Sequence, residues 1–359
     1  MRTLIRAEAA KADRDRRLSP AVVAALVEAG ATRMLAPASL GGGELDLPSW
    51  VREVEDLACA DGSTGWTAMT TSATSSLAWY LPPDAAEEVF GPPRSVVAGT
   101  AAPVGQAVEE AGGHRVTGRW GWGSAVSLCD WVLGGVMTSA GPRLMLFPAS
   151  AVTVHDTWHA AGLRATGTHE WEVADAFVPT RRALWPPAMR VDAPLPTFPF
   201  FGLLAVGVAA VTLGIAARAV EEAEALVVTG TSPGATSTPA ERPDVQRDLA
   251  TAEARLSSAR AFLHTEVAAR WSDAVNGRPS PPEPRARLRL ACSHAAAEAA
   301  SVTRLAFDIG GSPAVFEDSP LQRCLRDAHV AAQHTITSRR LFEAYGKVKL
   351  GVPTDTTGL

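Results

Sequence analysis

The chain has 359 residues, of which 47% are hydrophobic and 20% charged, and its formal net charge is −5 at pH 7. That length allows two or three structural units around a large core. The acidic balance gives no reason to expect a nucleic-acid partner, because such proteins carry a basic face. Four cysteines stand far apart without a C-x-x-C pair. We therefore expect neither a zinc site nor disulfides, and a cytoplasmic, reducing location.

Residues 1–92 predict a helical domain. The first 17 residues are charged and lack an apolar core segment, so they do not form a signal peptide. In "LSPAVVAALVEAG", Ser19 is placed to cap a helix that has Pro20 at its first position and Gly30 after its end. Two more helices are expected over 46–62 and 63–81, and a short one over 81–93.

Residues 93–196 predict a β domain, because apolar and polar residues alternate between glycine-rich turns. Several short strands are expected, arranged as a barrel or a sandwich. This gives an α+β, multi-domain chain.

Residues 197–359 predict a four-helix bundle, with long helices over 198–228, 243–275, 283–308 and 319–350. The connectors between them are rich in turn-forming residues. The most apolar stretch, 198–227, is long enough to cross a membrane. Its three glycines and its amphipathic "EEAEAL" continuation favour a helix buried in protein instead, so no membrane partner is expected.

This order of domains carries a family resemblance, together with two local sequences. "GLRATGTHEWEVADAFVP" (162–179) and "GGSPAVFEDSPLQRCLRDAHVAAQH" (310–334) resemble the acyl-CoA dehydrogenase superfamily. "VTGRWGWGSAVSLCDWVLGG" (116–135) and "RDAHVAAQH" (326–334) are similar to its flavin-dependent two-component (group D) monooxygenase branch.

The resemblance implies a homotetramer that receives reduced flavin, FMNH2 or FADH2, from a separate flavin reductase. O2 as cosubstrate would form a C4a-hydroperoxide, which hydroxylates a small, aromatic or polyketide-like substrate. No G-x-G-x-x-G fingerprint is present, so NAD(P)H binding by this chain is unsupported. The connector after the first bundle helix has only a late arginine, Arg242. A weak contact with the flavin pyrophosphate there would suit a flavin that arrives reduced and leaves oxidised.

Three alternatives remain open: an acyl-thioester dehydrogenase with FAD, an N-oxygenase of an amine or amino sugar, and a silent binding subunit. A dehydrogenase needs a carboxylate base. Where much of the family has that glutamate, this chain has "QHTI" (333–336), and the opening bundle helix has no acid before Glu221. Asp327 remains, but Arg323 stands four residues earlier, at salt-bridge spacing, and the pair is expected to be structural.

His334 is the predicted catalytic residue. It stands eight residues after Arg326, a spacing that resembles the monooxygenase branch. An imidazole with a near-neutral pKa suits proton transfer at the substrate or the oxygen adduct; the alternative is a core histidine with a satisfied hydrogen bond. His329 lies roughly 140° around a helix from His334, so no metal pair is expected.

The resemblance also implies the cofactor contacts. Trp122, Gly123 and Ser124 are expected along the flavin ring, and Thr168, after Gly167, at its N5 edge. Gly310 and Gly311 are expected to approach a neighbouring subunit's cofactor. The alternatives are core packing for Trp122, a β-bulge at Gly123 and a plain turn at 310–311.

Substrate contacts are expected on the helix over 63–81. Thr71, Thr74 and Ser75 would share one face, and Trp79 would lie near a flat ring. The alternative is a small-residue face used for close helix packing.

Overall fold

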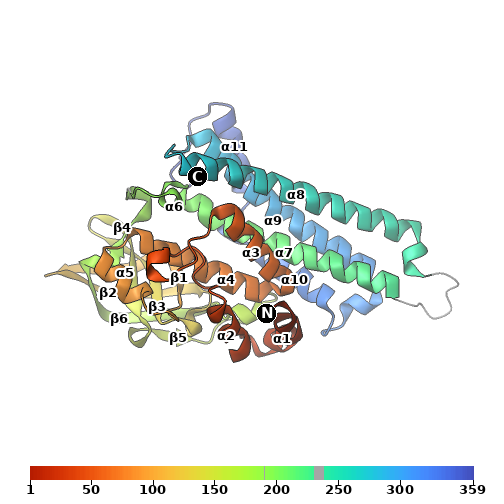
Figure 1. Cartoon of the computed structure of the whole chain (residues 1–359), viewed down its shortest axis with the longest axis horizontal. Helices are drawn as coiled ribbons and strands as arrows, with labels where there is room; N and C mark the ends of the chain where they lie inside the picture. Colours follow the sequence, from red (N-terminus) through yellow and green to blue (C-terminus); the bar gives the residue numbers. More distant parts are fainter. Residues whose placement is uncertain (190, 230–237) are drawn as a thin grey trace.

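The computed structural model describes residues 1–189, 191–229 and 238–359 (Figure 1). Its N-terminal part is helical, as predicted, and contains α1 (Arg2–Asp15), α2 (Pro20–Glu28), α3 (Leu47–Ala60), α4 (Gly62–Ser75) and α5 (Pro83–Phe90). Side chains cap these helices: Ser19 accepts from the Val22 N–H, and Asp61 accepts from the Thr64 N–H at 2.9 Å.

The predicted helix over 63–81 is shorter than expected. It ends at Ser75, and the chain continues as the 3-10 helix η2 (Ser76–Tyr80). Ser75 and Ser76 each donate a side-chain hydrogen bond to a carbonyl three residues back. Such local bonds compete with the regular α-helical ladder.

The middle β unit is confirmed as one seven-stranded sheet in the order β5-β6-β2-β1-β3-β4-β7. Its strands are β1 (Val97–Glu110), β2 (Gly113–Gly123), β3 (Trp131–Thr138), β4 (Gly141–Pro148), β5 (Thr153–His155), β6 (His169–Pro179) and β7 (Ala183–Leu184). Within the sheet Trp120 stacks on Trp171, with ring centroids 4.2 Å apart. This aromatic core supports the end of β2, where the predicted flavin contacts lie.

The C-terminal part contains the short α6 (Pro194–Thr197) and three long helices close to the predicted ranges: α7 (Phe200–Thr229), α8 (Pro243–Val275) and α9 (Pro282–Gly310). The fourth predicted helix, 319–350, is broken into α10 (Pro320–Ala331) and α11 (Arg340–Lys349). Between them stands the 3-10 helix η10 (Thr335–Thr337). His334 starts η10, because its side chain accepts the Ile336 N–H. His334 therefore lies in a turn and not on a continuous helix.

The long apolar helix α7 packs as a core helix. It is long and apolar enough to cross a membrane, but 78% of its most apolar window is buried. In Figure 1, α3 and α4 lie between the sheet and the bundle, and both contact α7. One buried cluster joins Trp50 and Met69 of these helices to Leu213 of α7. The N-terminal helices and the bundle thus share a core that fixes the position of α4.

Candidate active site

Trp66, near the start of α4, joins two of the predicted site residues. Its indole N–H donates to Ser124 Oγ at 3.0 Å. Its ring lies 5.8 Å from the His334 imidazole, centroid to centroid, with the planes inclined by 50°. Trp66 is almost fully buried. The catalytic candidate and the hydroxyl at the end of β2 are therefore both neighbours of one indole.

Buried hydroxyls continue this contact into the loop before β6. Ser124 Oγ lies 2.8 Å from Thr168 Oγ1, and Thr168 Oγ1 lies 2.7 Å from Thr166 Oγ1. Thr166 donates to the Leu163 carbonyl at 2.7 Å. Two segments predicted separately to contact flavin, at Ser124 and Thr168, are thus directly bonded to each other.

The protonation state of His334 follows from its position in the turn. Nδ1 accepts the Ile336 N–H at 3.2 Å, so the neutral ring carries its proton on Nε2. Burial, and secondly the charge of Arg289, lowers the pKa of His334 below 6.5. The residue as a whole is nevertheless exposed to solvent. At neutral pH the ring therefore offers an Nε2–H donor.

Arg289 of α9 holds the turn that carries His334. Its guanidinium donates to the Ile336 carbonyl at 2.8 Å and also to the Gly358 carbonyl. The side chain is only 3% exposed. Because Ile336 also donates to His334 Nδ1, Arg289 holds the turn that carries the imidazole, and its charge adds to the effect of burial in lowering the pKa of His334.

Trp122 is not a core residue. It is 73% exposed, it has a positive φ of 64°, and it meets Trp158 edge-on with ring centroids 5.9 Å apart. Such a strained, exposed aromatic residue beside a site points to a ligand or to another subunit.

The two glycines beside these residues allow close approach. At Gly123 the pairing of β2 with β6 is irregular, and a Cβ would lie 2.6 Å from Trp171, so the bulge expected as an alternative is present. Gly167 has φ +52° and ends the short 3-10 turn that carries Thr166.

Asp327 of α10 positions the loop that carries Thr166 and Thr168. It is 2% exposed and accepts the Leu163 N–H at 2.6 Å. Burial, with a contribution from Asp61, raises the pKa of Asp327 to about 7. The expected ion pair with Arg323 is not formed; Arg323 instead lies 3.9 Å from Asp61. Asp327 acts on the loop backbone, in keeping with a structural role.

Gly310 and Gly311 do not join this site within one chain. Gly310 ends α9 and is buried, whereas Gly311 has φ +56° and open space around it. The whole of α10, about 18 Å long, separates them from the turn at His334. Their predicted contact with a neighbouring subunit's cofactor remains a prediction.

The predicted substrate residues all donate hydrogen bonds to backbone carbonyls of the chain. Thr71 and Ser75 are buried and donate to the carbonyls of Thr67 and Ser72. Thr74 donates to the Thr70 carbonyl at 2.8 Å, and Trp79, on η2, donates to the Leu35 carbonyl at 3.0 Å. Close helix packing accounts for these positions, and substrate contact remains a prediction.

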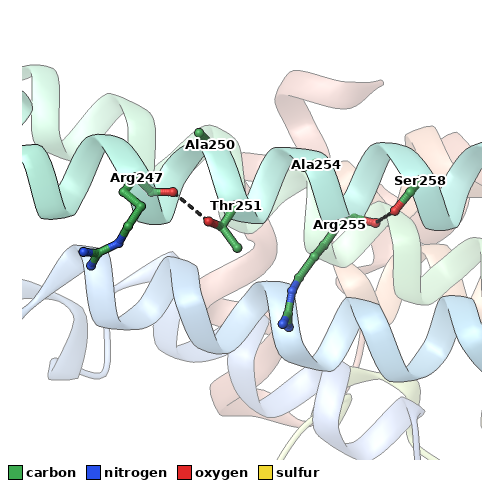
Figure 2. A pocket seen from close by; sticks show the side chains of 6 residues that line it. All are labelled: Arg247, Ala250, Thr251, Ala254, Arg255 and Ser258. Carbon is green, nitrogen blue, oxygen red and sulfur yellow. Dashed lines mark hydrogen bonds between the residues drawn. The ribbon is translucent and has the colours of Figure 1, made fainter.

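Two hollows of the described structure are not lined by His334. One cavity of about 490 Å³ adjoins the loop on its outer side and is lined by Arg16, Arg17, Thr166, Gly167 and His169 among others. The second, shown in Figure 2, is a shallow hollow on α8, where Thr251 and Ser258 donate to carbonyls of their own helix. In the described ranges no three His, Cys, Asp or Glu side chains are grouped to hold a metal ion.

Sequence reasoning proposed His334, Ser124 and Thr168, which the structure brings together around Trp66, but it did not single out Trp66, Thr166 and Arg289. Trp66 follows "GSTG" at the start of a helix, a place where a tryptophan gives no signal of its own. Neither acid considered for a dehydrogenase is free: Glu221 pairs with Arg6 at 2.6 Å, and Asp327 holds the loop. Of the candidate acid–base groups that the sequence offered, His334 is the one for which the described residues provide no salt-bridge partner and no structural hydrogen bond to another segment.

Comparison with known proteins defines the class of protein. A family described as acyl-CoA dehydrogenase, C-terminal domain, matches residues 206–339. The chain is 33% identical to an indole-3-acetate monooxygenase of Pseudomonas putida, over 96% of this chain and 90% of that protein. It is 30% identical to the flavin-dependent monooxygenase oxygenase subunit HsaA of Rhodococcus jostii (strain RHA1), over 95% and 94%. XiaF from Streptomyces sp., solved in complex with FADH2 and glycerol, superposes with a TM-score of 0.91 at 26% identity, covering 98% of this chain and 93% of that one.

The chain therefore belongs to the flavin-dependent monooxygenases built on the acyl-CoA dehydrogenase fold. It is an oxidoreductase that uses reduced flavin and O2 on a small molecule. The terms oxygenase subunit and oxygenase component used for its relatives imply a separate reductase. The expected family, fold, enzyme class and cofactor are confirmed.

Proposed function

We propose that the enzyme hydroxylates an aromatic substrate at the site between His334, Trp66 and the Ser124–Thr168 pair. The observation that carries this is the single indole joining the histidine to the hydroxyls. A flat site edged by an N–H donor and by hydroxyl oxygens suits a planar ring with a polar substituent. Relatives named for indole-3-acetate and resorcinol support an aromatic substrate over an amine.

The residues present fit a flavin at the end of β2. Trp122 offers an exposed indole face, and Ser124 and Thr168 offer hydroxyl oxygens. When bound, reduced flavin supplies the electrons that activate O2. His334 then donates its Nε2 proton as a hydrogen bond to the oxygen or the substrate, while buried Trp66 helps to keep water out.

We extend the proposal to the assembly. A cytoplasmic homotetramer, with domains over 1–92, 93–196 and 197–359, accommodates Gly310 and Gly311 at a neighbouring subunit. Next to Gly311, Val315 and Phe316 are 62% and 64% exposed, which favours an interface there. Light scattering on the purified chain measures its oligomeric state. A tetrameric wild type together with a monomeric Phe316→Ser variant would support an interface at this surface.

The test of the reaction uses the chain with a flavin reductase, FMN or FAD, and a panel of phenols and indoles. Hydroxylated product and released H2O2 are both quantified. His334→Gln is expected to lower product formation at least about 100-fold while binding of reduced flavin changes little. His329→Gln is the matched control, because His329 is exposed and bonded to Leu325. Equal product from both variants would remove His334 from the mechanism.

A further inference from the structure

Hydrogen bonds link Trp66 through three hydroxyl groups to the Leu163 carbonyl, and they can all point in one direction only. The three hydroxyls belong to Ser124, Thr168 and Thr166. A hydroxyl has one proton to donate, an indole N–H only donates, and a carbonyl only accepts. At one end Trp66 donates to Ser124, and at the other Thr166 donates to the Leu163 carbonyl. The two ends therefore determine which partner donates and which accepts in every hydrogen bond between them.

The donor and the acceptor of each bond follow step by step from the Leu163 end. Thr166 has used its proton on the carbonyl, so Thr168 must donate to Thr166 across their 2.7 Å contact. Thr168 then has no proton left, so Ser124 must donate to Thr168 across 2.8 Å. Ser124 in turn accepts from Trp66. Ser124 and Thr168 are left with a free acceptor lone pair each and no free proton.

The accepting end is held in place. The Leu163 carbonyl also accepts the Trp158 indole N–H at 3.0 Å, and the Leu163 N–H is held by Asp327 at 2.6 Å. All three threonine and serine side chains are less than 9% exposed, so bulk water does not readily supply another proton. A ligand edge that meets Ser124 or Thr168 must therefore bring a donor of its own.

The two redox states of a flavin differ in this respect. Reduced flavin carries a proton on N5 and donates, whereas N5 of the oxidised ring has only a lone pair. We propose that the fixed direction of these hydrogen bonds makes the site select reduced over oxidised flavin. Thr166 is the positioning residue, because its donation to the Leu163 carbonyl sets that direction. This rests on the proposed function and on the predicted place of Thr168 at the N5 edge of the flavin.

The experiment compares the affinities of both redox states in variants of Thr166. Thr166→Val keeps the shape and removes the hydroxyl, so Thr168 regains a proton that it can donate to oxidised N5. Dissociation constants for oxidised and reduced FMN and FAD are measured by anaerobic spectral titration of the full chain. Wild type is expected to bind the reduced form more tightly. Thr166→Val is expected to lower that preference by roughly 3- to 10-fold, and a tenfold change equals about 30 mV in a two-electron potential.

Three further variants make the result decisive. Thr166→Ser keeps the hydroxyl and should retain the wild-type ratio, and Thr166→Ala replaces the valine variant should that one fail to fold. Thr303→Val is the matched control, because Thr303 on α9 is also buried and donates to a carbonyl three residues back. A wild type that prefers reduced flavin, with an unchanged ratio in Thr166→Val and Thr166→Ala, would overturn the inference alone. A wild type that binds neither state would overturn the proposed function as well.

Discussion

At the scale of single residues, the chemistry of the site depends on where His334 carries its proton. The Ile336 N–H occupies Nδ1, so only Nε2–H faces outward in the neutral ring. A second proton must enter at Nδ1 and break that bond. Burial first, and the charge of Arg289 second, lower the pKa of His334, so the neutral donor persists below pH 6.5.

This state predicts the pH dependence of hydroxylation. Activity should fall on the acid side only as pH drops through the lowered pKa of His334, below 6.5. The limb should disappear in the residual activity of His334→Gln, because an amide does not titrate in this range. The measurement is the pH profile of product formation at saturating reduced flavin. An acid limb centred above pH 6.5 in the wild type would contradict the assignment.

A second residue-scale prediction concerns stability. The pKa of Asp327 rises on folding from 3.8 to about 7, so between these values the folded chain binds more protons than the unfolded one. Its contribution to the free energy of unfolding is thus present at low pH and is lost as pH rises toward 7. The groups that act on it are Asp61, Asp13, Arg323 and the Leu163 N–H.

Asp327→Asn keeps an oxygen for the Leu163 N–H and removes the titration. The free energy of unfolding of this variant, relative to that of the wild type, should therefore be higher at pH 8 than at pH 5 by more than about 1 kcal/mol. Denaturant unfolding at both pH values measures this difference. Asp308→Asn, at an exposed carboxylate paired with Arg304, is the control and should show no such gain. A difference that is equal at both pH values would mean that Asp327 does not titrate in this window.

At the scale of elements, the turn between α10 and α11 was the part that sequence periodicity could not predict. Apolar spacing continues through 319–350 and predicts one helix, but it contains no signal of side-chain capping by His334 or of the Arg289 contact from α9. Both are interactions between residues, one of them 47 positions apart. The motif resemblance found His334, and only the structure shows how the turn presents it.

Arg289→Met tests this turn. It removes two hydrogen bonds to backbone carbonyls, so the free energy of unfolding should drop by about 1–3 kcal/mol. It also removes the charge that helps to lower the pKa of His334, so the acid limb of the activity profile should move to higher pH. Arg304→Met, at an exposed arginine farther along α9, should change neither property. If stability is lost but the acid limb does not move, Arg289 holds the turn without affecting the pKa of His334.

At the scale of the whole molecule, the three-part order of helices, sheet and bundle follows from composition and periodicity, as does the core placement of α7. The sequence does not reveal how the parts meet. Gly214 of α7 lies so close to α3 that a Cβ would stand 2.3 Å from the Glu55 carbonyl. This contact places α4, and hence Trp66, between the sheet and the bundle. Such long-range packing has no local signature.

Gly214→Leu should therefore destabilise the chain by about 2 kcal/mol or more, because the backbone of α3 cannot yield to a side chain. Reduced flavin should bind more weakly in the same variant, since α3 carries α4 toward the site. Thermal unfolding and flavin titration measure both effects. Gly346→Ala on α11, where a Cβ meets open space, should be neutral or slightly stabilising. Wild-type stability in Gly214→Leu would show that the two helices separate easily.

The most direct test of the central claim is a single turnover with 18O2. Chain loaded anaerobically with reduced flavin and an aromatic substrate is mixed with labelled oxygen, and the product is analysed by mass spectrometry. We expect one labelled oxygen atom in the hydroxylated product of the wild type, and H2O2 with little product from His334→Gln. Labelled product in equal yield from both proteins, or H2O2 alone from the wild type across phenols and indoles, would contradict it.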